Sequence, residues 1–207
     1  MKRLSVLIVM FLGLFVQTVL AQPMKIVALG DSLTAGYGLG AGDGFTERLQ
    51  ARLKADGLDV SVVNAGVSGD TSKGGLARLD WSVPDDTALV ILELGANDAL
   101  RGIEPAQTRA NLDAMLTRLK ERNIPVLLAG MIAPPNMGED YGNAFNPIYA
   151  ELASKHGVAL YPFFLDGVAG EASLNQADGM HPNAKGTGII VERIAPAVMK
   201  ALGHNAS

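Results

Sequence analysis

The sequence has no cysteine and only three histidines among its 207 residues. The lack of cysteine excludes disulfides, thiolate nucleophiles and cysteine-ligated metal sites. Histidine, aspartate and glutamate nowhere cluster with the spacing of metal ligands, so we expect no metal and no cofactor. Basic residues number 17 against 21 acidic residues, without a basic patch, so we expect no nucleic-acid partner.

Long apolar runs are absent beyond the N-terminus. Residues 4–20 are apolar with three polar breaks, and they follow Lys2 and Arg3. This order, with the small residues at 19 and 21, predicts a secretory signal peptide over 1–21, cleaved after Ala21. An uncleaved anchor is the alternative, because the run is nearly long enough to span a bilayer. We expect an exported protein, periplasmic or else secreted, without stable membrane insertion after cleavage.

Cleavage would leave a single domain over residues 22–207. Its 186 residues are enough to bury a large core, which must supply the stability that disulfides cannot. Loss of Lys2 and Arg3 changes the formal charge from −4 to −6. We expect this domain to be a monomer.

Apolar runs alternate with amphipathic stretches along this domain. The apolar runs predict five buried strands, at 24–29, 60–63, 88–94, 126–131 and 158–161. Helical spacing predicts helices at 45–53, 105–122, 143–155 and 184–202, the last one kinked at Pro196. The alternation predicts an α/β fold with three layers, flavodoxin-like, around a five-stranded parallel sheet of order 2-1-3-4-5. Ligands of such folds bind beyond the carboxyl ends of the strands.

Polar residues follow three of the predicted strands. The motif GDSL at 30–33 contains Ser32, NAG at 64–66 ends with Gly66, and GAND at 95–98 contains Asn97. Each has a structural interpretation by itself: Ser32 as a helix N-cap, and the other two as turn residues. Their convergence on one edge of the sheet favours a functional site.

One of the three histidines has a carboxylate close to it in sequence. His181 lies in ADGMHP at 177–182, three positions after Asp178, and Gly179 allows a tight turn between them. A carboxylate at this spacing can accept the Nδ1–H group and leave Nε2 free to take a proton. The alternative is a loop histidine packed beside an N-capping aspartate. His156 is expected to bond the free carbonyls of a helix end or to lie by the helix dipole there, and His204 lies in the C-terminal tail.

These residues together can perform nucleophilic catalysis. Serine needs an adjacent base, and the base needs an orienting group, so we assign Ser32 as nucleophile, His181 as base and Asp178 as its partner. The oxyanion formed on attack needs donors that are already in place. The candidates are the backbone N–H groups of Ser32 and Gly66 and the side-chain amide of Asn97.

The same segments resemble a known family. GDSL at 30–33, a glycine in NAGVSGD at 64–70, GAND at 95–98 and DGMHP at 178–182 resemble the four signature blocks of the SGNH (GDSL) hydrolases. Segments such as ALRGIEP and LYPFFLDGV look closest to the thioesterase I, lysophospholipase L1 and arylesterase subgroup. The resemblance implies the SGNH fold, the roles given above and no direct catalytic role for Asp31. It also implies an acyl or aryl ester or thioester as the small-molecule substrate, cleaved through an acyl-enzyme on Ser32.

The sequence is less informative about the substrate. Five apolar residues near the predicted rim are candidates for a hydrophobic groove that binds an acyl chain: Leu100, Ile103, Met137, Tyr141 and Phe145. A carbohydrate acetylesterase on the same fold is the alternative enzyme. A flavodoxin-like binding module is the non-enzyme alternative. GYGLGA at 36–41 formally fits a dinucleotide fingerprint, but it begins six positions after Gly30.

Overall fold

The predicted parallel sheet is present in the computed structural model, which describes residues 22–204. Its order is β2-β1-β3-β4-β5, and every neighbouring pair is parallel, so the predicted order is confirmed. The strands are β1 (Met24–Gly30), β2 (Val60–Gly66), β3 (Thr87–Glu93), β4 (Val126–Ala129) and β5 (Ala159–Tyr161). The predicted signal peptide at 1–21 lies outside the described residues.

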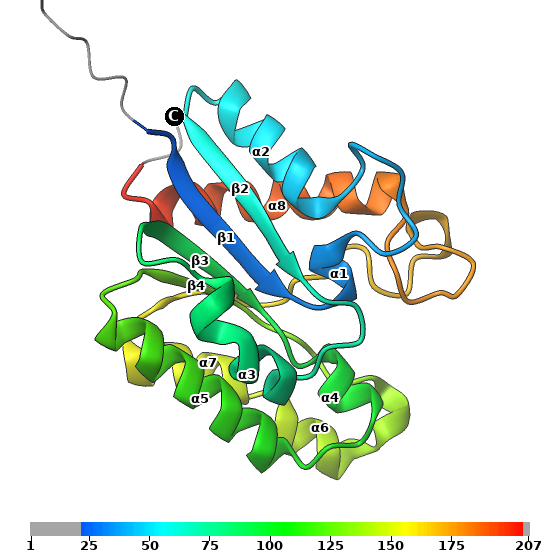
Figure 1. Ribbon diagram of the computed structural model, residues 1–207. Helices are drawn as coiled ribbons and strands as arrows, with labels where there is room; N and C mark the ends of the chain where they lie inside the picture. The colour runs from blue at the N-terminus through cyan, green and yellow to red at the C-terminus, as the bar shows by residue number, and fades with distance from the viewer. Residues whose placement is uncertain (1–21, 205–207) are drawn as a thin grey trace, which may run out of the picture.

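Helices cover both faces of the sheet (Figure 1). One face carries α2 (Phe45–Ala55) and α8 (Ala184–Ala201), and the other carries α3 (Ser72–Ser82), α5 (Pro105–Glu121) and α7 (Ile148–His156). Shorter elements are α1 (Ser32–Ala35), α4 (Ala96–Leu100), α6 (Glu139–Phe145) and the 3₁₀ helices η1 (Pro135–Met137) and η2 (Ala172–Leu174). Among residues 22–204, no helix has both the length and the apolar character to cross a membrane.

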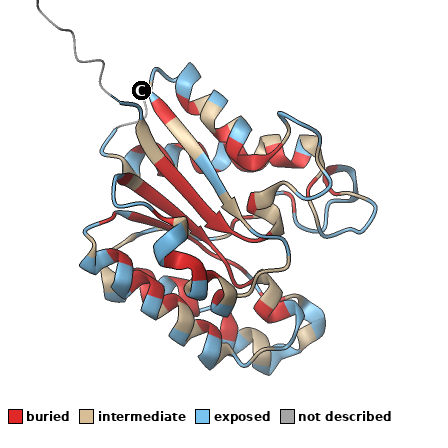
Figure 2. Cartoon of the chain, viewed as in Figure 1, coloured by how far each residue is buried: buried red, intermediate tan, exposed pale blue. Residues whose placement is uncertain are grey.

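The core lies between the sheet and its two helical layers (Figure 2). Residues 26–29 of β1 and 89–92 of β3 are fully buried, which is why these strands are continuous apolar runs. β2 lies at the edge of the sheet, and its residues Val63 and Asn64 are exposed. The carboxyl ends of β1, β2 and β3 therefore meet at one rim, next to α1 and α4 (Figure 1).

The single helix predicted at 143–155 is wrong. The chain forms α6, which ends at Phe145, and α7, which begins at Ile148. Pro147 lacks the N–H group needed to continue the first helix. Asn146 uses its Oδ1 atom to accept the N–H group of Ala133 (2.8 Å), which ties the break to the loop after β4.

The helix α3 was not predicted, because two glycines near its start lower the helical propensity of the segment. Both are required by close packing. A Cβ atom on Gly75 would lie 2.1 Å from Leu94 Cδ1, and one on Gly74 would lie 2.0 Å from Asp70 Oδ1. α3 can therefore pack closely under the loops that follow β2 and β3.

Candidate active site

Ser32 lies at the carboxyl end of β1, as the first residue of α1. The N-cap of this helix is Asp31, not Ser32, because Asp31 Oδ1 accepts the N–H group of Leu33 (3.0 Å). Gly30 is fixed by a close approach: a Cβ atom there would lie 2.1 Å from Thr34 Oγ1 and 2.4 Å from Glu93 Oε2. The GDSL segment thus turns the chain sharply and leaves the Ser32 hydroxyl free of the capping role.

Asp178 and His181 form a tight turn before α8. Gly179 has a φ of +70°, a conformation that favours glycine. Asp178 Oδ1 accepts the N–H groups of Met180 (2.9 Å) and His181 (3.0 Å), and Asp178 Oδ2 lies 2.6 Å from His181 Nδ1. These bonds, the backbone one from His181 foremost, lower the pKa of the Asp178 carboxyl to about 2. Asp178 therefore remains ionised at neutral pH and accepts the Nδ1–H group.

The other imidazole nitrogen faces the serine. His181 Nε2 lies 3.0 Å from Ser32 Oγ, although the two residues are 149 positions apart in sequence. With Nδ1 protonated towards Asp178, Nε2 is an acceptor for the Ser32 hydroxyl proton. The structure thus brings together the three residues that were predicted as nucleophile, base and orienting group.

Two residues that the sequence did not single out hold the histidine loop in place. Gln176 Nε2 donates to the carbonyls of Tyr37 (2.7 Å) and Pro182 (3.0 Å), so it joins the loop after α1 to the loop before α8. The Tyr37 ring packs against the His181 ring with a centroid distance of 4.6 Å. No local motif marks either residue, because their role depends on a contact between distant segments.

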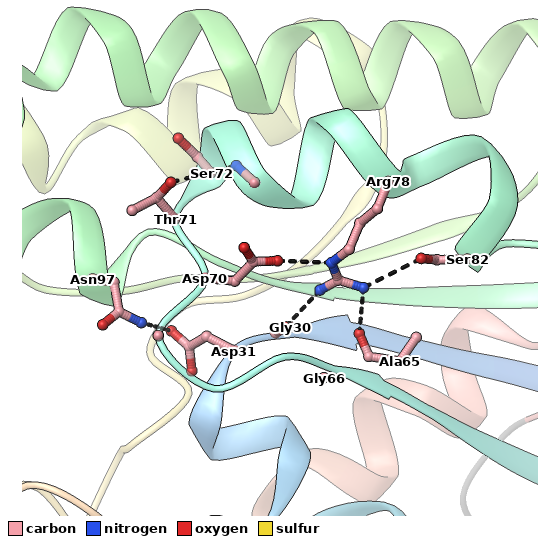
Figure 3. A network of polar contacts seen from close by, with 12 residues as sticks. Gly30, Asp31, Ala65, Gly66, Asp70, Thr71, Ser72, Arg78, Ser82 and Asn97 are labelled. Atoms are coloured by element: carbon pink, nitrogen blue, oxygen red, sulfur yellow. Dashed lines mark hydrogen bonds and ion pairs between the residues drawn. The ribbon is translucent and has the colours of Figure 1, made fainter.

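Asn97 lies beside the serine at the start of α4, and its amide is held by Asp31. Asn97 Nδ2 donates to Asp31 Oδ2 at 3.0 Å (Figure 3). An amide nitrogen carries two hydrogens, so one N–H group of Asn97 remains for a ligand. Asp31, Ser32 and Asn97 all line the same cavity.

A buried acidic pair underlies the serine. Asp31 and Glu93 are fully buried, and Glu93 Oε2 accepts from Thr34 Oγ1 (2.7 Å) and the Asp31 N–H group (3.3 Å). Burial raises the pKa of Asp31 to about 6, against bonds from Leu33 and Asn97 that lower it. Burial and the nearby Asp31 charge raise the pKa of Glu93 well above its ordinary value. No sequence pattern indicated this pair, because Glu93 looks only like part of a strand.

The structure gives Gly66 a different role from the one predicted. Its N–H group donates to Asn64 Oδ1 (2.9 Å), so it is not free for an oxyanion. A Cβ atom on Gly66 would lie 2.4 Å from the backbone nitrogen of Ala35, so glycine is needed there for packing against α1. Within the same segment, Gly69 has a φ of +82°, and its N–H group donates to no group in residues 22–204. Which glycine keeps a free N–H group depends on the Asn64 side chain, which a sequence pattern does not reveal.

A cavity of about 560 Å³ opens next to Ser32 and His181. Its wall is mostly apolar and includes Leu100, Met131, Ile132, Phe163, Leu165 and Met180. Of the five predicted groove residues, the structure places only Leu100 in this wall.

The other four predicted groove residues have structural roles. Phe145 is fully buried in the core, and the Tyr141 ring stacks on it with a centroid distance of 5.8 Å. The Tyr141 hydroxyl donates to the carbonyl of Ile103 (2.7 Å), and Met137 Cε lies next to Gly102. These contacts join the loop after α4 to η1 and α6, and the rings of Phe145 and Tyr141 belong to the core or pack against it.

The remaining sequence features do not contribute to this site. Gly36 ends α1 with a φ of +79°, so the GYGLGA run is a loop and not a strand-to-helix phosphate turn. His156 pairs with Asp113 instead of with free carbonyls. Within the described part of the chain, no three histidine, aspartate or glutamate side chains gather in a way that could hold a metal ion.

Known proteins resemble this chain over nearly its whole length. The family model of the GDSL-like lipases and acylhydrolases matches residues 28–189. Esterase TesA of Pseudomonas aeruginosa is 42% identical over 192 residues, which cover 92% of this chain and 96% of TesA. An arylesterase of Vibrio mimicus is 39% identical, with 86% of this chain and 90% of the arylesterase covered. The thioesterase 1/protease 1/lysophospholipase L1 of Escherichia coli is 38% identical, with 87% and 86% covered.

Solved structures agree with these relatives. The crystal structure of TesA superposes with a TM-score of 0.82 at 42% identity and covers 86% of this chain and 99% of its own. AlinE4, an SGNH-hydrolase family esterase, superposes with a TM-score of 0.74 at 45% identity, with 88% and 98% covered. The chain is therefore an enzyme of the esterase and thioesterase class, and it belongs to the GDSL-like lipase/acylhydrolase family, the SGNH hydrolases.

Proposed function

We propose that the enzyme hydrolyses carboxylic esters or thioesters of apolar acyl groups through an acyl-enzyme on Ser32. The observation that carries this proposal is the 3.0 Å contact between Ser32 Oγ and His181 Nε2 at the mouth of a largely apolar cavity. A serine paired with an oriented imidazole is suited to acyl transfer, and the apolar wall is suited to the acyl chain.

The acylation step follows from the three side chains. Ser32 Oγ attacks the carbonyl carbon of the substrate while His181 Nε2 takes the hydroxyl proton. Asp178 holds the ring through Nδ1–H and stabilises the imidazolium, since its lowered pKa keeps it ionised. The imidazolium then protonates the leaving alcohol or thiol, and the carbon–oxygen or carbon–sulfur bond breaks. Water attacks the acyl-enzyme with His181 again as base, which releases the acid and restores Ser32.

The negative oxygen formed in each step needs donors that point at it. We assign the free amide N–H group of Asn97 and the backbone N–H group of Ser32 to this role. Gly69 replaces Gly66 as the backbone donor after β2, because the N–H group of Gly66 is used by Asn64. The N–H groups of Ser32 and Gly69 are without a partner among residues 22–204. Loss of one such donor typically lowers the rate by about 10²–10³.

The cavity wall argues for a lipid-like or aryl acyl group over an acetylated sugar. A sugar ring would require polar partners, whereas this wall is formed mainly by leucine, isoleucine, methionine, phenylalanine and proline side chains. Its volume of about 560 Å³ is far more than an acetyl group needs. We therefore expect kcat/KM to rise from acetate to longer esters.

Covalent labelling tests this function. A fluorophosphonate should label the wild-type enzyme at one serine, and peptide mapping should identify that serine as Ser32. Ser32→Ala should fold normally and lose both labelling and turnover of p-nitrophenyl esters. Ser68→Ala, at an exposed serine of the loop after β2, is the matched control and should keep both. Turnover above background by purified Ser32→Ala would exclude Ser32 as the nucleophile. A preference of the wild-type enzyme for acetate over longer esters would favour the carbohydrate acetylesterase.

A further inference from the structure

The side chain of Arg78 lies under the active-site rim, although it comes from the second turn of α3. It is only 7% exposed, and each of its nitrogens donates (Figure 3). Nη2 donates to the carbonyl of Gly30 (2.8 Å), and Nη1 donates to the carbonyl of Ala65 (2.7 Å) and to Ser82 Oγ (3.3 Å). Nε donates to Asp70 Oδ2 (2.7 Å). One guanidinium group thus joins the ends of two strands and the loop after β2.

Each of these partners is close in sequence to a group that the proposed reaction uses. Gly30 is two residues before Ser32, and Asp70 directly follows Gly69. Ala65 lies at the end of β2, before the loop that contains Gly69. A shift of the guanidinium group would therefore move the nucleophile and a backbone oxyanion donor relative to each other.

The chemistry of the contact requires arginine. The planar guanidinium has five N–H donors in a fixed fork, so it can satisfy two carbonyls and a carboxylate in different directions at once. A lysine ammonium keeps the charge, but all its N–H donors are on one nitrogen atom, so it cannot reach all of these partners at once. Such a substitution would remove the bonds to the carbonyls of Gly30 and Ala65 while it preserves the ion pair with Asp70. The Gly30 carbonyl would keep only the N–H group of Val67 (3.0 Å).

We propose that Arg78 is a positioning residue, which fixes the Ser32 turn and the Gly69 loop in their reactive arrangement. This inference rests on the function proposed above for Ser32. Arg78 does not line the cavity, so it does not contact substrate, and its effect must pass through the backbone. Displacement of a reacting group by about 1 Å can lower a rate by roughly 10²-fold.

Arg122 provides a matched control at the other end of the sheet. Its side chain is 12% exposed, and it joins the end of α5 to the loop before β3 through the carbonyl of Val83 and the carboxylate of Asp85 (2.7 Å). The Arg78 side chain is 8% exposed by the same measure, and both arginines bond a backbone carbonyl and a carboxylate, although Asp85 is 92% exposed and Asp70 only 16%. The partners of Arg122 precede β3 and lie away from the carboxyl ends of the strands.

The experiment compares Arg78→Lys with Arg122→Lys, each purified as a folded protein. We expect both to lower Tm, and only Arg78→Lys to lower kcat, by about 10–100-fold with KM changed less than about threefold. The rate of fluorophosphonate labelling at Ser32 should fall in parallel with kcat. If Arg78→Lys does not fold, Asp70→Asn tests the same arrangement, because it removes the charge of one partner and retains both carbonyl bonds. It should also lower kcat, by a smaller factor.

The outcomes separate this inference from the proposed function. If the wild-type enzyme is not labelled at Ser32, the proposed function itself fails. If the wild type is labelled and Arg78→Lys, or Asp70→Asn in its place, has the wild-type kcat, Arg78 is only structural and the inference is overturned. An equal loss of kcat in Arg122→Lys would also overturn it, because the effect would then follow general destabilisation.

Discussion

At the scale of single residues, Asp31 combines two conflicting requirements. Its carboxylate caps α1 through Leu33 and holds the amide of Asn97, both of which favour the charged form. It is also fully buried next to Glu93, which favours the neutral form, and its pKa is raised to about 6 as a result. Ionised Asp31 therefore orients the Asn97 amide at neutral pH, at some cost in stability.

This cost predicts a pH dependence of folding. A pKa of about 6 in the folded state, above the 3.8 of the free group, means that the folded state binds the proton more tightly. The contribution of Asp31 to the free energy of unfolding is therefore fully present below the unfolded pKa. It is lost as the pH rises through 6, which lowers the free energy of unfolding by up to about 3 kcal/mol. Glu93, whose pKa is also raised, adds a decrease of the same sign. Asp31→Asn should therefore make the decrease between about pH 4.5 and pH 7 in the free energy of unfolding by urea smaller, by the share that Asp31 contributes.

Asp140→Asn, at an exposed carboxylate of α6, is the control and should leave the decrease unchanged. The groups with lowered pKa values, such as Asp178, ionise below this pH range and contribute no slope within it. Parallel pH profiles for the wild type and Asp31→Asn would contradict the assignment of the penalty to Asp31.

Asn97 allows a kinetic prediction. Its free N–H group would meet charge mainly in the transition state, so Asn97→Ala should lower kcat by about 10²–10³ and change KM little. Steady-state hydrolysis of a p-nitrophenyl ester measures both constants. Asn143→Ala, at an exposed asparagine of α6, should behave like the wild type. An effect that appears only in KM would count against the oxyanion role.

The sequence predicted residues of this site where chemistry is local. Asp178 and His181 are three positions apart and share a turn, so their pairing could be derived from spacing alone. Gly66 was predicted as a backbone donor for the oxyanion, but its N–H group is used in a hydrogen bond to Asn64, which the sequence does not reveal. Glu93 and Arg78 were missed, since their roles arise from contacts between segments far apart in sequence.

At the scale of secondary-structure elements, the turn between β3 and α4 sets the position of Asn97. Gly95 is the N-cap of α4 with a φ of +118°, and a Cβ atom there would lie 2.1 Å from Tyr149 Oη. Tyr149 is fixed because its hydroxyl donates to the carbonyl of Leu94 (2.9 Å). The turn is thus locked between the backbone of β3 and a buried side chain of α7.

Gly95→Ala should therefore destabilise the protein by about 3 kcal/mol or more, as measured by urea unfolding. Gly157→Ala is the control: Gly157 has a φ of +67°, but a Cβ atom there would have no neighbour within 4 Å, so the change should cost only about 1–2 kcal/mol. The next atom near the Gly95 position is Tyr149 Cζ at 3.4 Å. In the double variant, Tyr149→Phe should thus recover part of the stability that Gly95→Ala loses. If the two substitutions instead lower the free energy of unfolding additively, the steric explanation is contradicted.

Element prediction succeeded where burial was uniform and failed where packing overruled propensity. The continuous apolar runs of β1 and β3 marked a parallel sheet correctly, because both faces of these strands are buried. α3 was missed, since Gly74 and Gly75 weaken its helical signal although close contacts with Asp70 and Leu94 require them. The apolar spacing across α6 and α7 continued past Pro147, which hid the break between them.

At the scale of the whole molecule, the site is assembled from segments that span most of the domain. The serine follows the first strand, the asparagine follows the third, and the histidine comes from the loop before the last helix. The alternation of apolar runs and amphipathic stretches was sufficient to predict the fold, and the order of these motifs indicated the three residues assigned as nucleophile, base and orienting group. The lining of the apolar cavity was not predictable in the same way, because core and cavity walls use the same apolar side chains, as Phe145 shows.

Export can be tested on the same scale. All five strands and the Ser32, Asp178 and His181 groups lie within residues 22–204, so cleavage after Ala21 would remove no residue of the site. We propose that the active enzyme is the cleaved, exported chain.

Expression of the full sequence in a Gram-negative host should yield periplasmic esterase activity and a protein whose N-terminus is Gln22, as read by intact mass and N-terminal sequencing. Ala21→Arg, which spoils the small-residue cleavage pattern, should leave the larger precursor with the membrane fraction. Wild-type activity in the cytoplasm, on a chain that retains Lys2 and Arg3, would contradict the proposal.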